Sequence, residues 1–283
     1  LHLFGYGLTK NDLENFRQLD SLTPGHPEYG HTVGVEATTG PLGAGMGMAV
    51  GMAIAEAHLS AVFNRPGYDV VDHYTFVLGG DGCLMEGISS EAFSLAGTLK
   101  LNKLIVLYDS NRISIEGSTD IAFTEDVGKR MEAFGFQVLT VEDGNDVDAI
   151  RQADKERPSF IVVKTQIGQG CPAKQGTAAA HGEPLGEQNI QEMKKGFDWP
   201  SVEPFFVPEE IYAHYQTLTA DSAAEEARWN EMMEAYKNEF PELKAKWETY
   251  HYPLQAINTY NDDSYNVPFR SITLYFVGCS CIR

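Results

Sequence analysis

Short apolar runs alternate with longer amphipathic segments through the middle of the chain. Four of the runs are almost continuously apolar, which is typical of strands buried on both faces of a sheet. They are residues 74–80, 103–109, 136–141 and 159–164. Three helical segments lie at residues 88–100, 125–134 and 146–156. This alternation predicts an α/β fold with a doubly wound parallel sheet flanked by helices, and ligands at the carboxyl ends of its strands.

Helical patterns also flank this region. A helix is predicted to start at residues 11–20, and from Pro41 small and apolar residues continue in a helical pattern for several turns. Helices are also predicted at residues 187–195, 208–218 and 221–240. We therefore divide the chain into a first domain, a helical extension and an irregular tail with no assigned role. Their bounds are residues 1–200, 201–250 and 251–283.

The charge balance narrows the classes of partner. The chain has 40 acidic and 21 basic residues, a formal net charge of −19, which repels nucleic acids and anionic membranes. An anionic small molecule could bind only where a metal ion or backbone dipoles reverse the field. The four cysteines lack the spacing of a disulfide framework or zinc ribbon, and no secretory signal is visible. We therefore expect reduced cysteines and a cytoplasmic location.

Two polar motifs follow neighbouring predicted strands. Gly79-Gly80-Asp81-Gly82 ends the first strand, and Asn111 follows the second. The interval between them fits one helix and one strand, the crossover that brings parallel strand ends side by side. A carboxylate, an amide oxygen and a main-chain carbonyl are ligands that suit Mg2+. Taken alone, Gly-Asp-Gly is more often an ordinary turn.

Longer blocks carry a family resemblance. Residues 23–28 (TPGHPE), 34–45 (GVEATTGPLGAG) and 80–92 (GDGCLMEGISSEA) resemble transketolase, and the likeness extends from about Tyr6 to Trp247. Gly-Asp-Gly followed at this distance by Asn is the family's thiamine diphosphate motif. The resemblance implies transfer of a two-carbon ketol unit from a ketose phosphate to an aldose phosphate in the pentose phosphate pathway. It also implies thiamine diphosphate, Mg2+ (with Ca2+ or Mn2+ as substitutes) and sugar phosphates as substrates.

The same resemblance assigns roles to single positions. Metal ligation falls to the side chains of Asp81 and Asn111 and the carbonyl of Ile113. Cofactor contacts fall to Leu42, Gly80, Asp81, Gly82, Glu86, Asn111, Ile115 and His181. His26 and His181 become the catalytic proton carriers, although a loop histidine taken alone is usually a surface residue. Glu86 and Glu91 become carboxylates at a dimer interface, although two such glutamates are otherwise simply a solvated pair.

The chain also departs from the family pattern. We expect an opening segment ahead of Leu1 and the pyrimidine-binding domain to be absent, and the helix before Pro158 to be short. The chain alone should then be catalytically deficient, acting as a homodimer or with a separate pyrimidine-domain chain. Alternatives are dihydroxyacetone synthase, a phosphoketolase, a pyruvate dehydrogenase component or a non-catalytic pseudo-enzyme. The Gly-His-Pro-Glu and Thr-Thr-Gly-Pro-Leu-Gly blocks favour the first of these, or transketolase, over the others.

Overall fold

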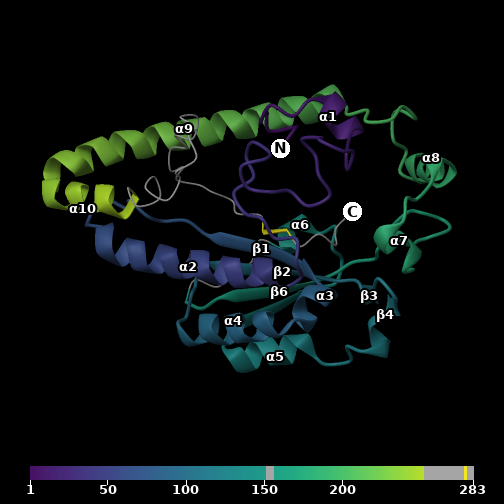
Figure 1. Cartoon of the computed structure of the whole chain (residues 1–283), viewed down its shortest axis with the longest axis horizontal. Coiled ribbons are helices and arrows are strands. Elements are labelled where there is room, and N and C mark those ends of the chain that lie inside the picture. Colours follow the sequence, from purple (N-terminus) through teal and green to yellow (C-terminus); the bar gives the residue numbers. More distant parts are fainter. Residues whose placement is uncertain (151–155, 252–276, 279–283) are drawn as a thin grey trace.

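The computed structural model describes residues 1–150, 156–251 and 277–278, and a parallel β-sheet forms its centre (Figure 1). The strand order is β5-β6-β2-β1-β7, with every neighbouring pair parallel. The strands are β1 (Thr75–Gly80), β2 (Leu104–Ser110), β5 (Gln137–Val141), β6 (Ser159–Lys164) and β7 (Val277–Gly278). The parallel sheet and its four predicted strands are confirmed. Beyond residue 251, only β7 is described, so the predicted irregular tail falls mostly outside the described residues.

Helices cover the sheet and continue beyond it. Those that follow or precede strands are α2 (Ala44–Phe63), α3 (Asp81–Met85), α4 (Gly87–Thr98), α5 (Val127–Phe134) and α6 (Val147–Ile150). The others are α1 (Lys10–Glu14), α7 (Ala179–Gly182), α8 (Glu187–Gly196), α9 (Glu209–Glu239) and α10 (Pro241–His251). A small antiparallel hairpin, β3 (Ile113–Ser114) and β4 (Gly117–Ser118), follows β2 and was not predicted. A 3-10 turn, Thr119–Ile121, comes directly after it.

The core lies on both faces of the sheet. On one face, Val77, Val106 and Phe160 pack with side chains of α2, α4 and α5 in one buried cluster. On the other, Ile105 and Ile161 belong to a second cluster, against which α6 packs. Alternate residues of a strand face opposite sides, so the continuous apolar runs supply both clusters. The doubly wound arrangement is confirmed.

Helix α2 is the one described helix that is long and apolar enough to cross a membrane by length and composition alone. One side of it packs in the core, because Met46 and Ala49 are buried against the sheet. It also carries a buried carboxylate, Glu56, whose Oε1 lies 2.5 Å from the Nζ of Lys103 at the start of β2.

The last two helices pack against the end of α2. The hydroxyl of Tyr236 on α9 donates to the carbonyl of Phe63 at 2.7 Å, and the indole of Trp229 donates to the carbonyl of Val70 at 3.0 Å. Two separate helices were predicted here, which is wrong, because α9 runs unbroken. The residues at the expected break are helix-compatible, and the hydroxyl of Thr219 bonds back to the carbonyl of Tyr215 within the helix.

One smaller expectation also needs correction. The helix predicted near residues 11–20 is shortened to α1, because Arg17 and Asp20 adopt left-handed backbone conformations. Of the cysteines expected to be reduced, Cys171 is free and buried.

Candidate functional site

The candidate site lies where β1 and β2 end. Gly80 pairs with Asp109 in the register of the two strands, so the loops that follow them start side by side, as the crossover spacing predicts. Helix α3 begins at Asp81, directly after β1. The segment after β2 turns at Arg112, which has a left-handed φ of 63°, into the β3–β4 hairpin. This turn returns the chain toward Asp81.

Asp81 is held by two hydrogen bonds from the second loop and strand. Its Oδ1 accepts from the hydroxyl of Tyr108 at 2.5 Å, and its Oδ2 accepts from the backbone N–H of Arg112 at 3.1 Å. The side chain is buried, with 4% of its surface exposed. Burial raises the pKa of Asp81 above the ordinary aspartate value, although both hydrogen bonds oppose the rise and nearby Asp109 adds to it.

Asn111 is fixed at both ends of its amide. Its Oδ1 accepts from the backbone N–H of Ile113 at 2.9 Å, and its Nδ2 donates to Oδ2 of Asp109 at 3.3 Å. The other oxygen of Asp109 accepts from the hydroxyl of Thr165, which follows β6. The ends of three adjacent strands therefore contribute to one hydrogen-bonded cluster.

The donor set fits a hard divalent cation. Asp81 and Asp109 lie near each other, and none of the salt bridges between described residues includes either carboxylate. Two neighbouring carboxylates, one of them buried, favour a bound cation. The described part of the chain has no group of three His, Cys, Asp or Glu residues arranged for a metal. An ion here would therefore need oxygens from an amide, a carbonyl, a ligand and water, as Mg2+ accepts.

Leu42 and Gly43, which directly precede α2, pack against the start of α3 and α4 at this site. A Cβ placed on Gly82 would lie 3.2 Å from Cδ1 of Leu42, so these two predicted cofactor residues are neighbours. Gly43 has a left-handed φ of 80°, and a Cβ there would lie 2.8 Å from both Cβ of Glu86 and Cγ2 of Ile88. Only glycine permits this conformation and this approach. Leu42, Gly82 and Glu86 are thus brought together beside Asp81.

The remaining predicted residues are placed as follows. His181 lies in α7, half-buried, and its Nδ1 is buried without a hydrogen-bond partner among the described residues. His26 is exposed in the N-terminal loop. Ile115, 69% exposed, lies in the turn between β3 and β4, and Glu91 is exposed on α4. No hydrogen bond between described residues joins either histidine to Asp81, so their catalytic roles stay predictions.

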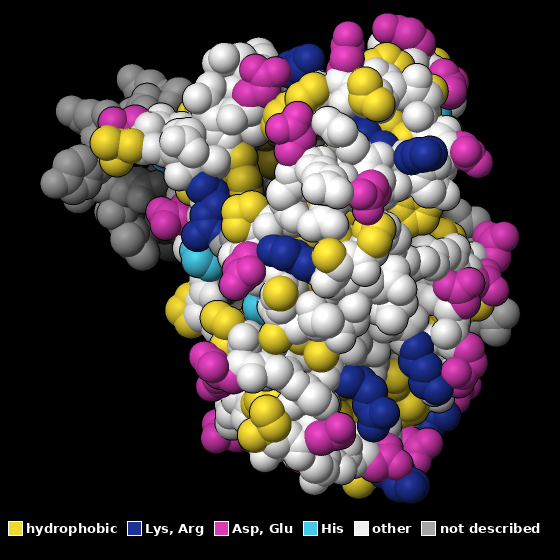
Figure 2. Space-filling view, turned by 90° about the vertical axis from the view of Figure 1, so that its right-hand side faces the viewer, with side chains coloured by type: hydrophobic (Ala, Val, Ile, Leu, Met, Phe, Trp, Pro, Cys, Tyr) yellow, Lys and Arg dark blue, Asp and Glu magenta, His cyan; other side chains and the backbone are white. Residues whose placement is uncertain are grey.

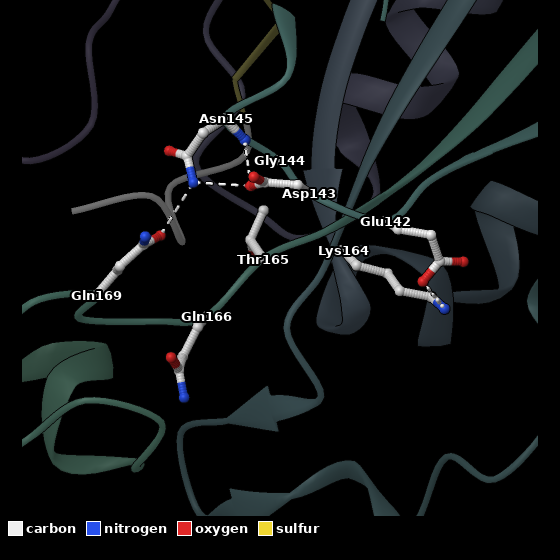
Figure 3. A pocket seen from close by; sticks show the side chains of 8 residues that line it. All are labelled: Glu142, Asp143, Gly144, Asn145, Lys164, Thr165, Gln166 and Gln169. Atoms are coloured by element: carbon white, nitrogen blue, oxygen red, sulfur yellow. Dashed lines mark hydrogen bonds and ion pairs between the residues drawn. The ribbon is translucent and has the colours of Figure 1, made fainter. Parts of the chain in front are cut away.

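A polar pocket adjoins this site at the carboxyl ends of β5 and β6 (Figure 3). Its lining residues are Glu142, Asp143, Gly144, Asn145, Lys164, Thr165, Gln166 and Gln169. None of them was predicted as a site residue. Thr165 connects the pocket with the cluster described above, since its hydroxyl bonds to Asp109. Tyr108, Asp109 and Thr165 are the contacts that sequence reasoning missed, and the signal available was their position at strand ends next to Asn111.

Figure 2 shows the face onto which the carboxyl ends of the strands open. Lys and Arg side chains are scattered on it among Asp and Glu side chains, rather than gathered into one patch. On this face an anion would therefore depend on a bound cation and backbone N–H groups.

Comparisons with known proteins give consistent matches. The family described as "Transketolase, thiamine diphosphate binding domain" matches residues 1–252. The transketolase of Geobacillus stearothermophilus is 54% identical over 253 residues, covering 87% of this chain and 38% of that protein. Transketolase 1 of Escherichia coli is 51% identical, again covering 87% and 38%. The chain thus spans about two fifths of the length of these relatives.

Solved structures give the same result. The structure of transketolase from Leishmania mexicana superposes with a TM-score of 0.83 at 49% identity, covering 87% of this chain and 38% of that one. A transketolase from Pichia stipitis in complex with sedoheptulose 7-phosphate gives a TM-score of 0.83 at 44% identity, covering 87% and 37%.

Proposed function

Because this chain belongs to the transketolase family, through the thiamine diphosphate binding domain that matches residues 1–252, we propose that it binds thiamine diphosphate together with Mg2+ where β1 and β2 end. The observation that carries the proposal is the buried carboxylate of Asp81, which accepts from the backbone N–H of the residue after Asn111, lies near Asp109 and has no salt bridge within the described structure. A divalent ion would balance this charge, and the diphosphate would complete its coordination.

Some of the predicted site residues would bind the metal ion, and the others would contact the cofactor. Asp81 and Asn111 would bind Mg2+ through side-chain oxygens, and Ile113 through its carbonyl. Mn2+ or Ca2+ could substitute for Mg2+. Gly80 and Gly82 leave room for backbone N–H groups to approach the diphosphate. Leu42, Ile115, Glu86 and His181 would contact the rest of the cofactor.

The proposed reaction is the transfer of a two-carbon ketol unit from a ketose phosphate to an aldose phosphate in the pentose phosphate pathway. When bound, thiamine diphosphate supplies the electron sink that lets the carbon–carbon bond beside a ketose carbonyl break and re-form. Sugar phosphates as substrates are supported by the Pichia stipitis transketolase complexes with sedoheptulose 7-phosphate and fructose 6-phosphate. In this chain, His26 and His181 would move protons at the sugar hydroxyls.

A second subunit would complete the site. Glu86 and Glu91 are exposed, and exposed apolar side chains on the same segment, Met85, Ile88 and Leu95, accompany them. Apolar side chains exposed together are typical of an interface. We therefore propose a homodimer, or pairing with a chain that supplies the pyrimidine-binding domain. Residues 1–200 and 201–250 would be the cofactor domain and a helical extension, and the cytoplasmic location stays a prediction.

Calorimetric titration of the chain with thiamine diphosphate tests this proposal. With Mg2+ present, we expect saturable binding that is lost when EDTA removes the metal, and lost in Asp81→Ala. Asp143→Ala is the matched control, because this aspartate follows β5 in the same sheet and its side chain bonds only locally, to Asn145. Absence of metal-dependent binding in the unmodified chain would contradict the proposal.

The transfer reaction needs a separate assay. We expect the chain alone to be inactive with xylulose 5-phosphate and ribose 5-phosphate, because it spans only 38% of the length of its transketolase relatives. A normal rate from the purified chain would show that this expectation is wrong. Formaldehyde as acceptor would distinguish dihydroxyacetone synthase activity.

A further inference from the structure

We propose that Tyr108 and Asp109, consecutive residues of β2, are positioning residues, each orienting one of the two side chains assigned to the divalent cation. Tyr108 orients Asp81, and Asp109 orients Asn111. This inference rests on the proposed function, because it concerns the same site. The inference goes beyond the proposed function by assigning roles to two residues outside the predicted ligand set.

Tyr108 restrains the carboxylate of Asp81. Its ring is buried, with 5% of its surface exposed, and packs against the ring of Phe160 with centroids 5.7 Å apart. A buried tyrosine hydroxyl needs a polar partner, and this one donates to Oδ1 of Asp81 at 2.5 Å. Since Oδ2 accepts from the N–H of Arg112, both oxygens of the carboxylate are held, and its plane is fixed.

Asp109 restrains the amide of Asn111. An asparagine amide presents an acceptor at one end and donors at the other, and only its oxygen can bind a metal. Asp109 accepts from the Nδ2 end at 3.3 Å, which directs Oδ1 of Asn111 toward the loop that carries Ile113. Asp109 is itself held by the hydroxyl of Thr165, which directly follows β6, the strand paired with β2.

Fixed ligand orientation matters most for Mg2+. This ion demands near-octahedral geometry, and partners that orient metal ligands typically change metal affinity by about 10- to 100-fold. Successive residues of a strand face opposite sides of the sheet. Tyr108 and Asp109 at the end of β2 can therefore each orient a different metal ligand.

Electron paramagnetic resonance of Mn2+, measured on the full chain with saturating thiamine diphosphate, tests the proposal. Tyr108→Phe and Asp109→Leu each remove an orienting contact with little change in side-chain size. We expect each to weaken Mn2+ affinity by about 10- to 100-fold. The controls are Tyr236→Phe, which loses a buried hydroxyl bond to Phe63 far from the site, and Asp143→Leu, which alters an aspartate that follows β5 and whose side chain bonds only locally, to Asn145. Both controls should bind Mn2+ like the unmodified chain.

The outcomes separate the two proposals. If the unmodified chain binds Mn2+ and both β2 variants bind it equally well, the positioning role is overturned. If the controls weaken binding as much as the β2 variants, general destabilisation explains the loss and the positioning role is likewise overturned. If the unmodified chain shows no Mn2+ binding with thiamine diphosphate, the proposed function itself fails.

Discussion

Asp81 and Asn111 accept hydrogen bonds from consecutive backbone amides: Oδ2 of Asp81 from Arg112 at 3.1 Å, and Oδ1 of Asn111 from Ile113 at 2.9 Å. Two residues that are far apart in sequence are thereby tied to one short stretch of backbone. The left-handed conformation of Arg112 places both amides in this arrangement. A cation bound by these two oxygens would fix the backbone of Arg112 and Ile113 relative to the ends of β1 and β2.

The raised pKa of Asp81 predicts a specific pH dependence in the metal-free chain. Because burial raises this pKa in the folded state, the folded chain binds the proton more tightly than the unfolded chain. The contribution of Asp81 to the free energy of unfolding therefore falls as pH rises from the ordinary aspartate range through the raised pKa. Urea unfolding of the unmodified chain and Asp81→Asn between pH 4 and 7 checks this. The stability of the unmodified chain relative to the variant should decrease toward pH 7, and a constant difference would contradict the burial argument.

Lys103 and Glu56 give a second prediction, at the opposite end of the strands. Lys103 lies 2.5 Å from the buried carboxylate of Glu56 and 2.7 Å from the exposed carboxylate of Asp72. Lys103→Met leaves Glu56 buried without its cation and should cost about 3 kcal/mol at pH 7. The cost should shrink toward pH 5, because burial already raises the pKa of Glu56 and loss of the lysine raises it further, so that protonation relieves the buried charge.

The matched control for this pair is Asp72→Asn, which removes the exposed partner of the same lysine and should cost less than about 1 kcal/mol. Thermal and denaturant unfolding at the two pH values measure both variants. Equal losses from Lys103→Met and Asp72→Asn would show that burial of Glu56 is not the deciding factor.

A glycine contact between α4 and α5 gives a third prediction. A Cβ on Gly97 would lie 1.7 Å from the carbonyl oxygen of Phe134, so the two helices touch through backbone. Gly97→Ala must separate them and should lower the free energy of unfolding by at least about 2 kcal/mol. Gly51→Ala on α2 meets nothing within 4 Å and should instead raise it by about 0.5–1 kcal/mol. Urea unfolding distinguishes the signs, and a neutral Gly97→Ala would contradict the close contact.

The sequence was sufficient for the features that depend on local pattern. Apolar runs predicted β1, β2, β5 and β6, and the spacing between Gly82 and Asn111 predicted neighbouring strand ends. It was insufficient where long-range contact decides. The pairing of β7 with β1 joins distant segments. The break predicted within α9 was instead an error in interpreting a local pattern, because nothing in the middle of α9 breaks a helix. The hydrogen bonds that hold Asp81 and Asn111 depend on the register of β2, which no local pattern discloses.

The most direct test of the metal site is the anomalous scattering of Mn2+ in crystals of the chain grown with thiamine diphosphate. We expect one Mn2+ peak at roughly 2.0–2.3 Å from a carboxylate oxygen of Asp81, Oδ1 of Asn111, the carbonyl oxygen of Ile113 and two diphosphate oxygens. A diphosphate bound elsewhere, or a peak that lacks Asp81 and Asn111 as ligands, would contradict it.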